Sequence, residues 1–239
     1  MITFERAVIF ANGTVFADHP LELTDNDYLV AADGGADHLI RRGLTPHLLV
    51  GDLDSISRST LAFCEANNVE VLTFPKDKDE TDLELALKET LDRGFKNIVL
   101  TRVLGDIPDH TLGNLALLAM PEIGKVRVFI SDGGWRIYLV RKEITLDAHI
   151  GDRVSLIPWN GAASGIFTVG LHYSLRNETL YPWKSRGISN VVQRSPFRVS
   201  LEEGALLLLH FTESFPNDTV GNDSKAGNMN NSDSKAKNN

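Results

Sequence analysis

Acidic residues gather four times in the first half of the chain, and each cluster follows an apolar run, either at its end or in the loop just beyond. In chain order the clusters contain Asp33; Asp52 and Asp54; Asp77, Asp79, Glu80 and Asp82; and Asp109. Carboxylates that repel one another gather mainly to hold a hard cation, and Mg²⁺ commonly takes one or two carboxylates together with substrate phosphates. The clusters therefore predict an enzyme that uses Mg²⁺ and a nucleotide.

The segment Gly51–Ser55 carries two carboxylates at positions i and i+2, Asp52 and Asp54. On an extended segment two such side chains point the same way, so both could reach one ion or its bound waters. The alternative is a turn at the end of a strand, with an aspartate as a local cap and Ser57 beginning the next helix.

The third cluster ends in a capping box, in which Thr81 is the N-cap and Glu84 reaches back to it. Asp82 is also favourable in a first helical turn. The box leaves Asp79 unexplained, together with the neighbouring Lys78, which could neutralise carboxylates or contact phosphate as a point charge. A solvated, charged loop explains the same residues equally well.

Three further segments are polar at places where a ligand could bind. Asp33, Gly34 and Gly35 stand between a predicted strand and a predicted helix, where they make either an ordinary tight turn or a contact between backbone N–H groups and an anion. The Asp109–His110 pair precedes another helix, where Asp109 could simply cap. The loop Ser185–Asn190 could hydrogen-bond a ligand or make a turn, and composition favours the turn.

Apolar runs and helical patterns alternate over about the first 130 residues, which predicts βαβ units. The expected strands are Ala7–Ala11, Tyr28–Ala32, Leu48–Val50, Val69–Phe74, Ile98–Val103 and Val126–Ile130, and the expected helices are Ala36–Arg42, Ser57–Asn67, Thr81–Arg93 and about Thr111–Ala119. The fold class is α/β, with a mainly parallel, Rossmann-like sheet flanked by helices. The acidic residues then lie at the carboxyl ends of the strands, where open parallel sheets bind ligands.

After residue 135 the segments are short, β-branched or aromatic, and no helical period is visible. This pattern predicts a smaller all-β domain, a sandwich or a barrel. We expect an α/β domain over residues 1–135, the all-β domain over 136–214, and a disordered, Asn-rich tail over 215–239, which has few apolar residues to bury.

The net charge of −8 argues against a nucleic-acid partner, because such binding normally rests on a surplus of Lys and Arg. The single cysteine, Cys64, excludes an internal disulfide and a cysteine zinc site, and is expected to be a buried thiol. The sequence shows neither a signal peptide nor an apolar run long enough to span a bilayer, so we expect no membrane partner and a cytoplasmic location.

Six motifs occur in an order that resembles the thiamine pyrophosphokinase family. They are Asp33–Gly35, Gly51–Ser55, Asp77–Asp82, Asp109–Asn114, Gly170–Leu175 and Ser185–Asn190. Each motif is weak alone, but six in order, over about residues 6–211, make a specific match. The resemblance implies transfer of pyrophosphate from ATP to the hydroxyl of thiamine, which gives thiamine diphosphate and AMP.

The resemblance also implies a role for each matching residue. Asp52, Asp54, Asp79 and Asp82 would hold Mg²⁺; Asp52, Asp54 and Asp79 would be catalytic; Asp33, Gly34, Gly35, Lys78, Asp109 and His110 would line the ATP site; and Ser189 and Asn190 would bind thiamine. The family has an α/β domain, a β-sandwich domain and a homodimer in which the active sites lie across the subunit interface.

The sequence departs from the family pattern at one position. Ile107 stands where the family usually carries an arginine that contacts phosphate, so Arg102 or another basic residue would have to replace it. Two alternatives stay open: a related pyrophosphokinase acting on a pterin or another hydroxymethyl heterocycle, and a non-catalytic sensor of nucleotide or thiamine.

Overall fold

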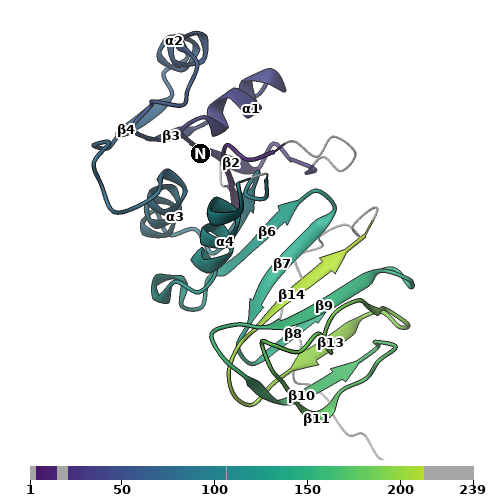
Figure 1. Ribbon diagram of the computed structural model, residues 1–239. Helices are drawn as coiled ribbons and strands as arrows, with labels where there is room; N and C mark the ends of the chain where they lie inside the picture. The colour runs from purple at the N-terminus through teal and green to yellow at the C-terminus, as the bar shows by residue number, and fades with distance from the viewer. Residues whose placement is uncertain (1–3, 15–20, 106, 213–239) are drawn as a thin grey trace, which may run out of the picture.

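Ten strands form one continuous sheet, and four more form a smaller antiparallel sheet that packs against one end of it (Figure 1). The computed structural model describes residues 4–14, 21–105 and 107–212. The tail predicted over 215–239 lies outside these residues. Within them, no helix is long and apolar enough to cross a membrane.

The elements have the following bounds. The strands are β1 (Arg6–Phe10), β2 (Asp27–Ala32), β3 (Leu48–Gly51), β4 (Glu70–Thr73), β5 (Asn97–Thr101), β6 (Arg127–Asp132), β7 (Trp135–Val140), β8 (Glu143–Leu146), β9 (Arg153–Pro158), β10 (Ala163–Val169), β11 (Arg176–Leu180), β12 (Asn190–Val191), β13 (Phe197–Ser200) and β14 (Leu206–Phe211). The helices are α1 (Gly35–Arg41), α2 (Arg58–Ala66), α3 (Asp82–Asp92), α4 (Pro108–Leu117) and the 3₁₀ turn η1 (Pro121–Ile123).

The first six strands run parallel in the order β6-β5-β1-β2-β3-β4. The register aligns their carboxyl ends, because Phe10 pairs with both Ala31 and Thr101 and Ala32 pairs with Val50. The chain moves outward from β1 to β4 and then returns to place β5 on the other side of β1. The switch point between β1 and β5 is where open sheets of this kind bind ligands.

Helices cover both faces of the parallel sheet, as the alternating pattern predicts. Leu39 of α1 and Cys64 of α2 are buried against one face, and Leu83 and Leu87 of α3 are buried against the other. Serine and threonine caps begin two of the helices: Ser57 accepts the N–H of Thr60, and Thr81 accepts the N–H of Glu84. The predicted α/β fold and the predicted buried thiol are therefore confirmed.

The second half of the chain extends the same sheet instead of starting a separate one. β6 turns into β7 through Gly133 and Gly134, and β14, β9 and β12 follow antiparallel beyond β7. The small sheet, β11-β10-β13-β8, closes a sandwich over these strands, with Leu156 and Leu208 buried in one core with Phe197. The predicted sandwich is confirmed, whereas the boundary at residue 135 stays a prediction, because the sheet runs through it without a break.

Candidate functional site

A cavity of about 400 Å³ opens at the switch point between β1 and β5. The segments that follow three aligned strands line it, namely residues 11–14 after β1, Asp33 after β2 and residues 102–105 after β5, together with the amino-terminal part of α4, including His110. Asp82, at the start of α3, also contributes. The parallel topology thus brings together residues that are far apart in the sequence.

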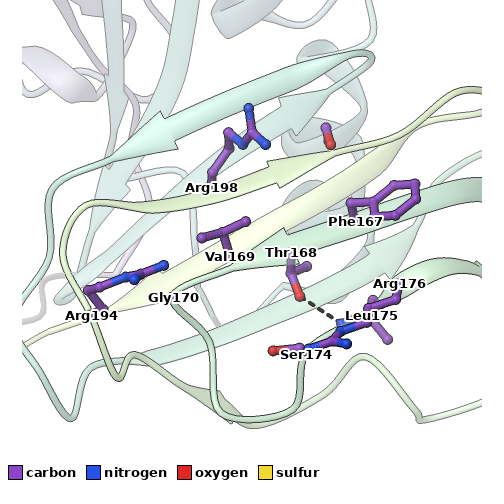
Figure 2. Close-up of a pocket in the computed structure, with 10 residues that line it drawn as sticks. Phe167, Thr168, Val169, Gly170, Ser174, Leu175, Arg176, Arg194 and Arg198 are labelled. Atoms are coloured by element: carbon purple, nitrogen blue, oxygen red, sulfur yellow. Dashed lines mark hydrogen bonds between the residues drawn. The ribbon is translucent and has the colours of Figure 1, made fainter.

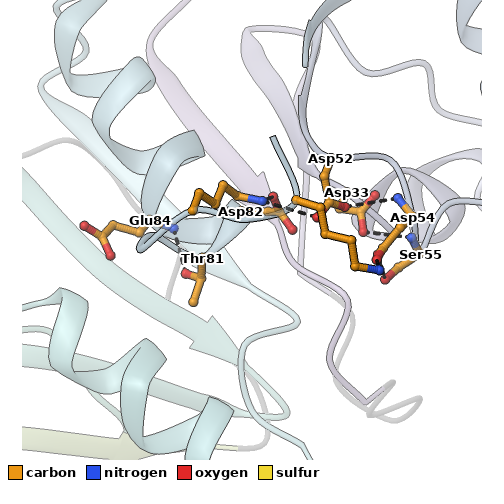
Figure 3. Close-up of polar contacts among 9 residues, drawn as sticks. Asp33, Asp52, Asp54, Ser55, Thr81, Asp82 and Glu84 are labelled. Atoms are coloured by element: carbon orange, nitrogen blue, oxygen red, sulfur yellow. Dashed lines mark hydrogen bonds and ion pairs between the residues drawn. The ribbon is translucent and has the colours of Figure 1, made fainter. Parts of the chain in front are cut away.

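Three carboxylates form an acidic cluster at this cavity: Asp33, Asp52 and Asp82 each offer an oxygen within 4.8 Å of the others (Figure 3). Asp33 follows β2 in a left-handed conformation (φ 43°) and donates its N–H to the carbonyl of Val50 at 2.8 Å, which fixes it beside the end of β3. Gly51 keeps the base of the cluster clear, because a Cβ there would lie 2.9 Å from the Cβ of Asp33.

Asp33 is the most enclosed member of the acidic cluster, at 5% exposure. Its Oδ2 accepts the backbone N–H of Ser55 at 3.1 Å, but its buried Oδ1 has no hydrogen-bond partner among the described residues. Burial raises the pKa of Asp33 above its ordinary value, and the charges of Asp82 and Asp52 raise it further. An unpaired, buried carboxylate oxygen beside two other carboxylates fits the donor set of a hard cation.

Lys78 lies against the acidic cluster and neutralises part of its charge. Its ammonium lies 3.3 Å from Asp52 and 3.1 Å from Asp82, and its side chain is only 12% exposed. Burial opposes its charged form, but the two carboxylates outweigh burial and raise the pKa of Lys78. Three carboxylates against one ammonium leave an excess of negative charge at this position.

Asp52 belongs to the acidic cluster and Asp54 does not, and Leu53 between them adopts a left-handed conformation (φ 66°). The prediction that this segment is extended is therefore wrong. Asp54 is exposed and points to Lys76, whose ammonium lies 2.5 Å from its Oδ2, and this hydrogen bond lowers the pKa of Asp54. Asp54 is not part of the acidic cluster, and its assignment as a metal ligand stays a prediction.

Asp79, Asp109 and His110 lie at the surface near the cavity. Asp79 is exposed in the loop before α3 and is outside the acidic cluster. α4 begins at Pro108, three residues earlier than predicted, so Asp109 lies in its first turn and accepts the N–H of His110 at 3.0 Å. Of these three residues, His110 lines the cavity.

Packing explains both glycines of the Asp33–Gly35 turn. A Cβ at Gly35 would overlap the carbonyl oxygen of Phe10, and a Cβ at Gly34 would lie 2.5 Å from the side-chain nitrogen of Asn12. The two glycines thus let α1 approach β1 closely. Their contact with ATP stays a prediction.

The predicted thiamine-binding residues lie in the other half of the molecule. Asn190 is buried, and its side chain binds the backbone of Tyr173 in both directions: its Oδ1 accepts the N–H at 2.9 Å and its Nδ2 donates to the carbonyl at 2.8 Å. Ser189 is exposed and donates its N–H to Ser155 Oγ at 3.0 Å. The Asn190 side chain therefore fixes a loop that presents Tyr173, which is 64% exposed.

Other residues that line the cavity had no predicted role. Asn12 and Thr14 follow β1, and Asn114 of α4 donates its side-chain N–H to the carbonyl of Val103 at 2.8 Å. The Asn12–Gly13 pair that closes the first apolar run is the sequence signal for this part of the site. Its importance depends on β1 lying beside β5, which the sequence does not reveal.

A second hollow, of about 540 Å³, lies on the small sheet (Figure 2). It is lined by Arg176 of β11, Arg198 of β13 and Arg194 from the connecting loop, together with the exposed Phe167. Arg198 also lies 3.3 Å from Glu143. None of the predicted site residues lines this hollow, so the switch-point cavity is the candidate active site.

Two models of one protein family match the chain. The thiamin pyrophosphokinase catalytic domain matches residues 20–130, and the thiamin pyrophosphokinase vitamin B1 binding domain matches residues 141–206. The first match contains the whole acidic cluster, and the second contains Ser189 and Asn190.

Similar proteins have the same descriptions. A thiamine pyrophosphokinase of Bacillus subtilis is 26% identical over 186 residues, which are 77% of this chain and 87% of that protein. Thiamine pyrophosphokinase 1 of Arabidopsis thaliana is 27% identical over 204 residues, covering 74% and 75%.

Solved structures share the fold. The thiamine pyrophosphokinase structure from Bacillus subtilis superposes with a TM-score of 0.78 at 24% identity and covers 87% of this chain and 99% of that one. The thiamin pyrophosphokinase from Candida albicans superposes with a TM-score of 0.69 at 16% identity, covering 87% and 90%.

Proposed function

Because this chain belongs to the thiamin pyrophosphokinase family, we propose that it transfers pyrophosphate from ATP to thiamine. The hydroxyl oxygen of thiamine attacks the β-phosphorus of ATP and forms the new O–P bond. The bond from the β-phosphorus to the oxygen that bridges to the α-phosphate breaks, and AMP leaves with that oxygen. The observation that carries the proposal is the acidic cluster at the switch-point cavity, within the residues that the catalytic-domain model matches.

We infer that the cation of this site is Mg²⁺, held by Asp33, Asp52 and Asp82. Each of the three carboxylates offers an oxygen, and Asp33 Oδ1 is buried without a partner among the described residues, which suits an oxygen-seeking ion that also binds phosphates. Mg²⁺ bound there would offset the negative charge of the phosphates in a loose transition state. The ammonium of Lys78 already lies among these carboxylates and is close enough to exchange one of them for a phosphate oxygen.

In this proposal the remaining predicted residues would lie at the rim of the site. Asp54 and Asp79 are exposed, so either can approach the thiamine hydroxyl and accept its proton from the open side. Asp54 is ionised at neutral pH, as an ordinary aspartate is, and its hydrogen bond with Lys76 lowers its pKa further. The backbone of Gly34–Gly35 and the side chains of Asp109 and His110 would face the nucleotide.

We further propose that the active form is a homodimer in which one protomer supplies the thiamine residues to the other. Asn190 lies in β12, seven strand positions away from β2 in the sheet, and the acidic cluster lies at the end of β2. Strands about 4.8 Å apart place these two sites roughly 30 Å apart along the sheet. That span is much longer than a thiamine molecule, so one protomer cannot present both sites to one substrate.

Exposed apolar side chains near Asn190 support an interface in this region. Trp183 is 76% exposed, and Tyr173 and Ile188 are more than half exposed. Aromatic residues are enriched at the centres of protein interfaces, and they also provide faces on which a heterocycle can stack.

The cytoplasmic location stays a prediction of the sequence.

Formation of thiamine diphosphate and AMP from ATP and thiamine tests the proposal directly. Chromatography should show equal amounts of the two products, and EDTA should abolish both. A hydroxymethylpterin in place of thiamine tests the alternative acceptor, and we expect no AMP with it. Binding of both substrates without AMP formation would refute the enzyme and favour a sensor.

A further inference from the structure

Arg102 occupies an unusual position beside the switch point. It directly follows β5 in a left-handed conformation (φ 60°), and only 8% of it is exposed. Arg102 lines the same cavity as Asp33 and Asp82. Its Nε is buried and has no hydrogen-bond partner among the described residues. A buried cationic group is costly unless it is paired, so an unpaired guanidinium N–H indicates a missing anionic partner.

The charged groups around Arg102 do not supply that partner. The buried Asp132 is close enough for Arg102 to act on its pKa, but its Oδ2 already accepts the backbone N–H groups of Val103 and Leu104 at 3.0 and 3.1 Å. Arg102 also acts electrostatically on His38 and Arg42, neither of which is an anion. Burial, Arg41 and Arg102 lower the pKa of His38. Among the described residues, none of these groups pairs with the buried Nε of Arg102.

Arg102 is also the one lysine or arginine among the described residues that line the cavity. Ile107 lines the same cavity, is 58% exposed, and offers no charge. The triphosphate of ATP carries more negative charge than one divalent ion neutralises. A planar guanidinium can bind two phosphate oxygens at once, which makes arginine well suited to the remaining charge.

We propose that Arg102 binds a phosphate group of ATP and supplies from the end of β5 the cationic contact that Ile107 cannot make. This inference rests on the proposed function, because it assumes that ATP occupies the switch-point cavity. The acidic cluster then binds the triphosphate from the β2–β3 side through the metal, and Arg102 binds it from the β5 side.

Arg102→Gln tests the inference. The substitution removes charge-assisted hydrogen bonds to phosphate, and their loss should weaken binding of Mg²⁺–ATP by about 10-fold or more. Calorimetry with ATP in the absence of thiamine measures this, and steady-state kinetics should show a raised KM for ATP with a KM for thiamine that changes much less. Arg141→Gln is the matched control, because Arg141 is exposed and hydrogen-bonds to the carbonyl of Ala119, away from the cavity.

A second substitution separates phosphate binding from a structural role. Ile107→Arg in the Arg102→Gln protein returns a cation to the same cavity, and we expect it to restore most of the lost ATP affinity. Arg102→Lys should bind ATP with intermediate affinity, because lysine keeps the charge but lacks the planar fork. If Arg102→Gln does not fold, Arg102→Lys and Ile107→Arg alone still test the idea, with weaker and tighter ATP binding as the expected results.

Two results would overturn the inference. One is unchanged ATP affinity in Arg102→Gln or Arg102→Lys. The other is a loss that Ile107→Arg does not restore and that lowers thiamine and ATP binding equally. The failure of the proposed function is a different result: the unsubstituted protein would bind Mg²⁺–ATP with the Arg102 dependence described above, yet form no thiamine diphosphate.

Discussion

The substitution Asp33→Asn should make the metal-free protein more stable while it weakens the metal site. Asp33 is the buried member of the acidic cluster, and burial together with Asp82 and Asp52 raises its pKa. A carboxyl group whose pKa is raised on folding destabilises the folded state at every pH where it is ionised. Asparagine has nearly the same shape and removes the charge.

The size of the effect follows from the spacing of the carboxylates. The ligand oxygens lie within 4.8 Å of one another. At that distance two like charges repel by about 3.5 kcal/mol at an effective dielectric constant of about 20, and by about 1 kcal/mol in water. Lys78 offsets part of this repulsion, and the hydrogen bond from Ser55 becomes weaker when its acceptor is neutral. We expect a net gain of about 1 kcal/mol, which raises the melting temperature by about 2–4 °C for a domain of this size.

Thermal unfolding in EDTA and in Mg²⁺ provides the assay. The unsubstituted protein should melt at a higher temperature in Mg²⁺, because a ligand at 100 times its Kd stabilises by about 2.7 kcal/mol. The Asp33→Asn protein should have a higher melting temperature than the unsubstituted protein in EDTA, and Mg²⁺ should raise that temperature much less. Asp147→Asn, an exposed change in the other half of the chain, should match the unsubstituted protein in both conditions. An equal Mg²⁺ response in Asp33→Asn and the unsubstituted protein would refute Asp33 as a ligand.

Three further predictions follow from single contacts. Asn190→Ala removes two hydrogen bonds to the backbone of Tyr173, so it should lower the melting temperature and raise the KM for thiamine more than that for ATP; equal rises in both would contradict a link to thiamine. Asp54→Asn should lower kcat but leave the Mg²⁺-induced rise in melting temperature nearly unchanged, because Asp54 lies outside the acidic cluster. Loss of that rise would show instead that Asp54 binds the metal. Burial holds the pKa of His210 below its ordinary value of 6.5, so stability should be complete above about pH 6.5 and fall by up to ~1.4 kcal/mol per pH unit below it. Unfolding measured between pH 7.5 and 5.5 checks this, and a flat profile would contradict it.

The gathering of the carboxylates could be predicted from the sequence, but their directions could not. Apolar runs followed by aspartates place Asp33 and Asp52 at aligned strand ends, and parallel pairing then makes them neighbours. Asp54 lies outside the acidic cluster and Leu53 before it is left-handed, and a leucine gives no local signal for that conformation. The ion pairs of Lys78 depend on the path of the loop before α3, so the sequence does not predict their partners either.

The sequence also does not predict which sheet each strand in the second half of the chain joins. Alternation of apolar and polar residues predicts a strand but does not say which strand it joins. β14 lies between β7 and β9, and these long-range pairings make the antiparallel strands an extension of the parallel sheet. A change in composition near residue 135 predicts two domains, although the backbone hydrogen bonds continue across that position.

The two sides of the switch-point cavity offer groups of opposite charge to a ligand, and the proposed role of Arg102 accounts in this way for the isoleucine at position 107. The β2–β3 side presents carboxylates that require a cation, while the β5 side presents the buried, unpaired Nε of Arg102, which requires an anion. A metal–triphosphate complex satisfies both requirements at once, whereas free Mg²⁺ or free triphosphate satisfies only one. The cavity should therefore bind the two components cooperatively. Because Arg102 at the end of β5 already supplies a guanidinium to the cavity, the site does not need a second arginine at position 107, just before α4.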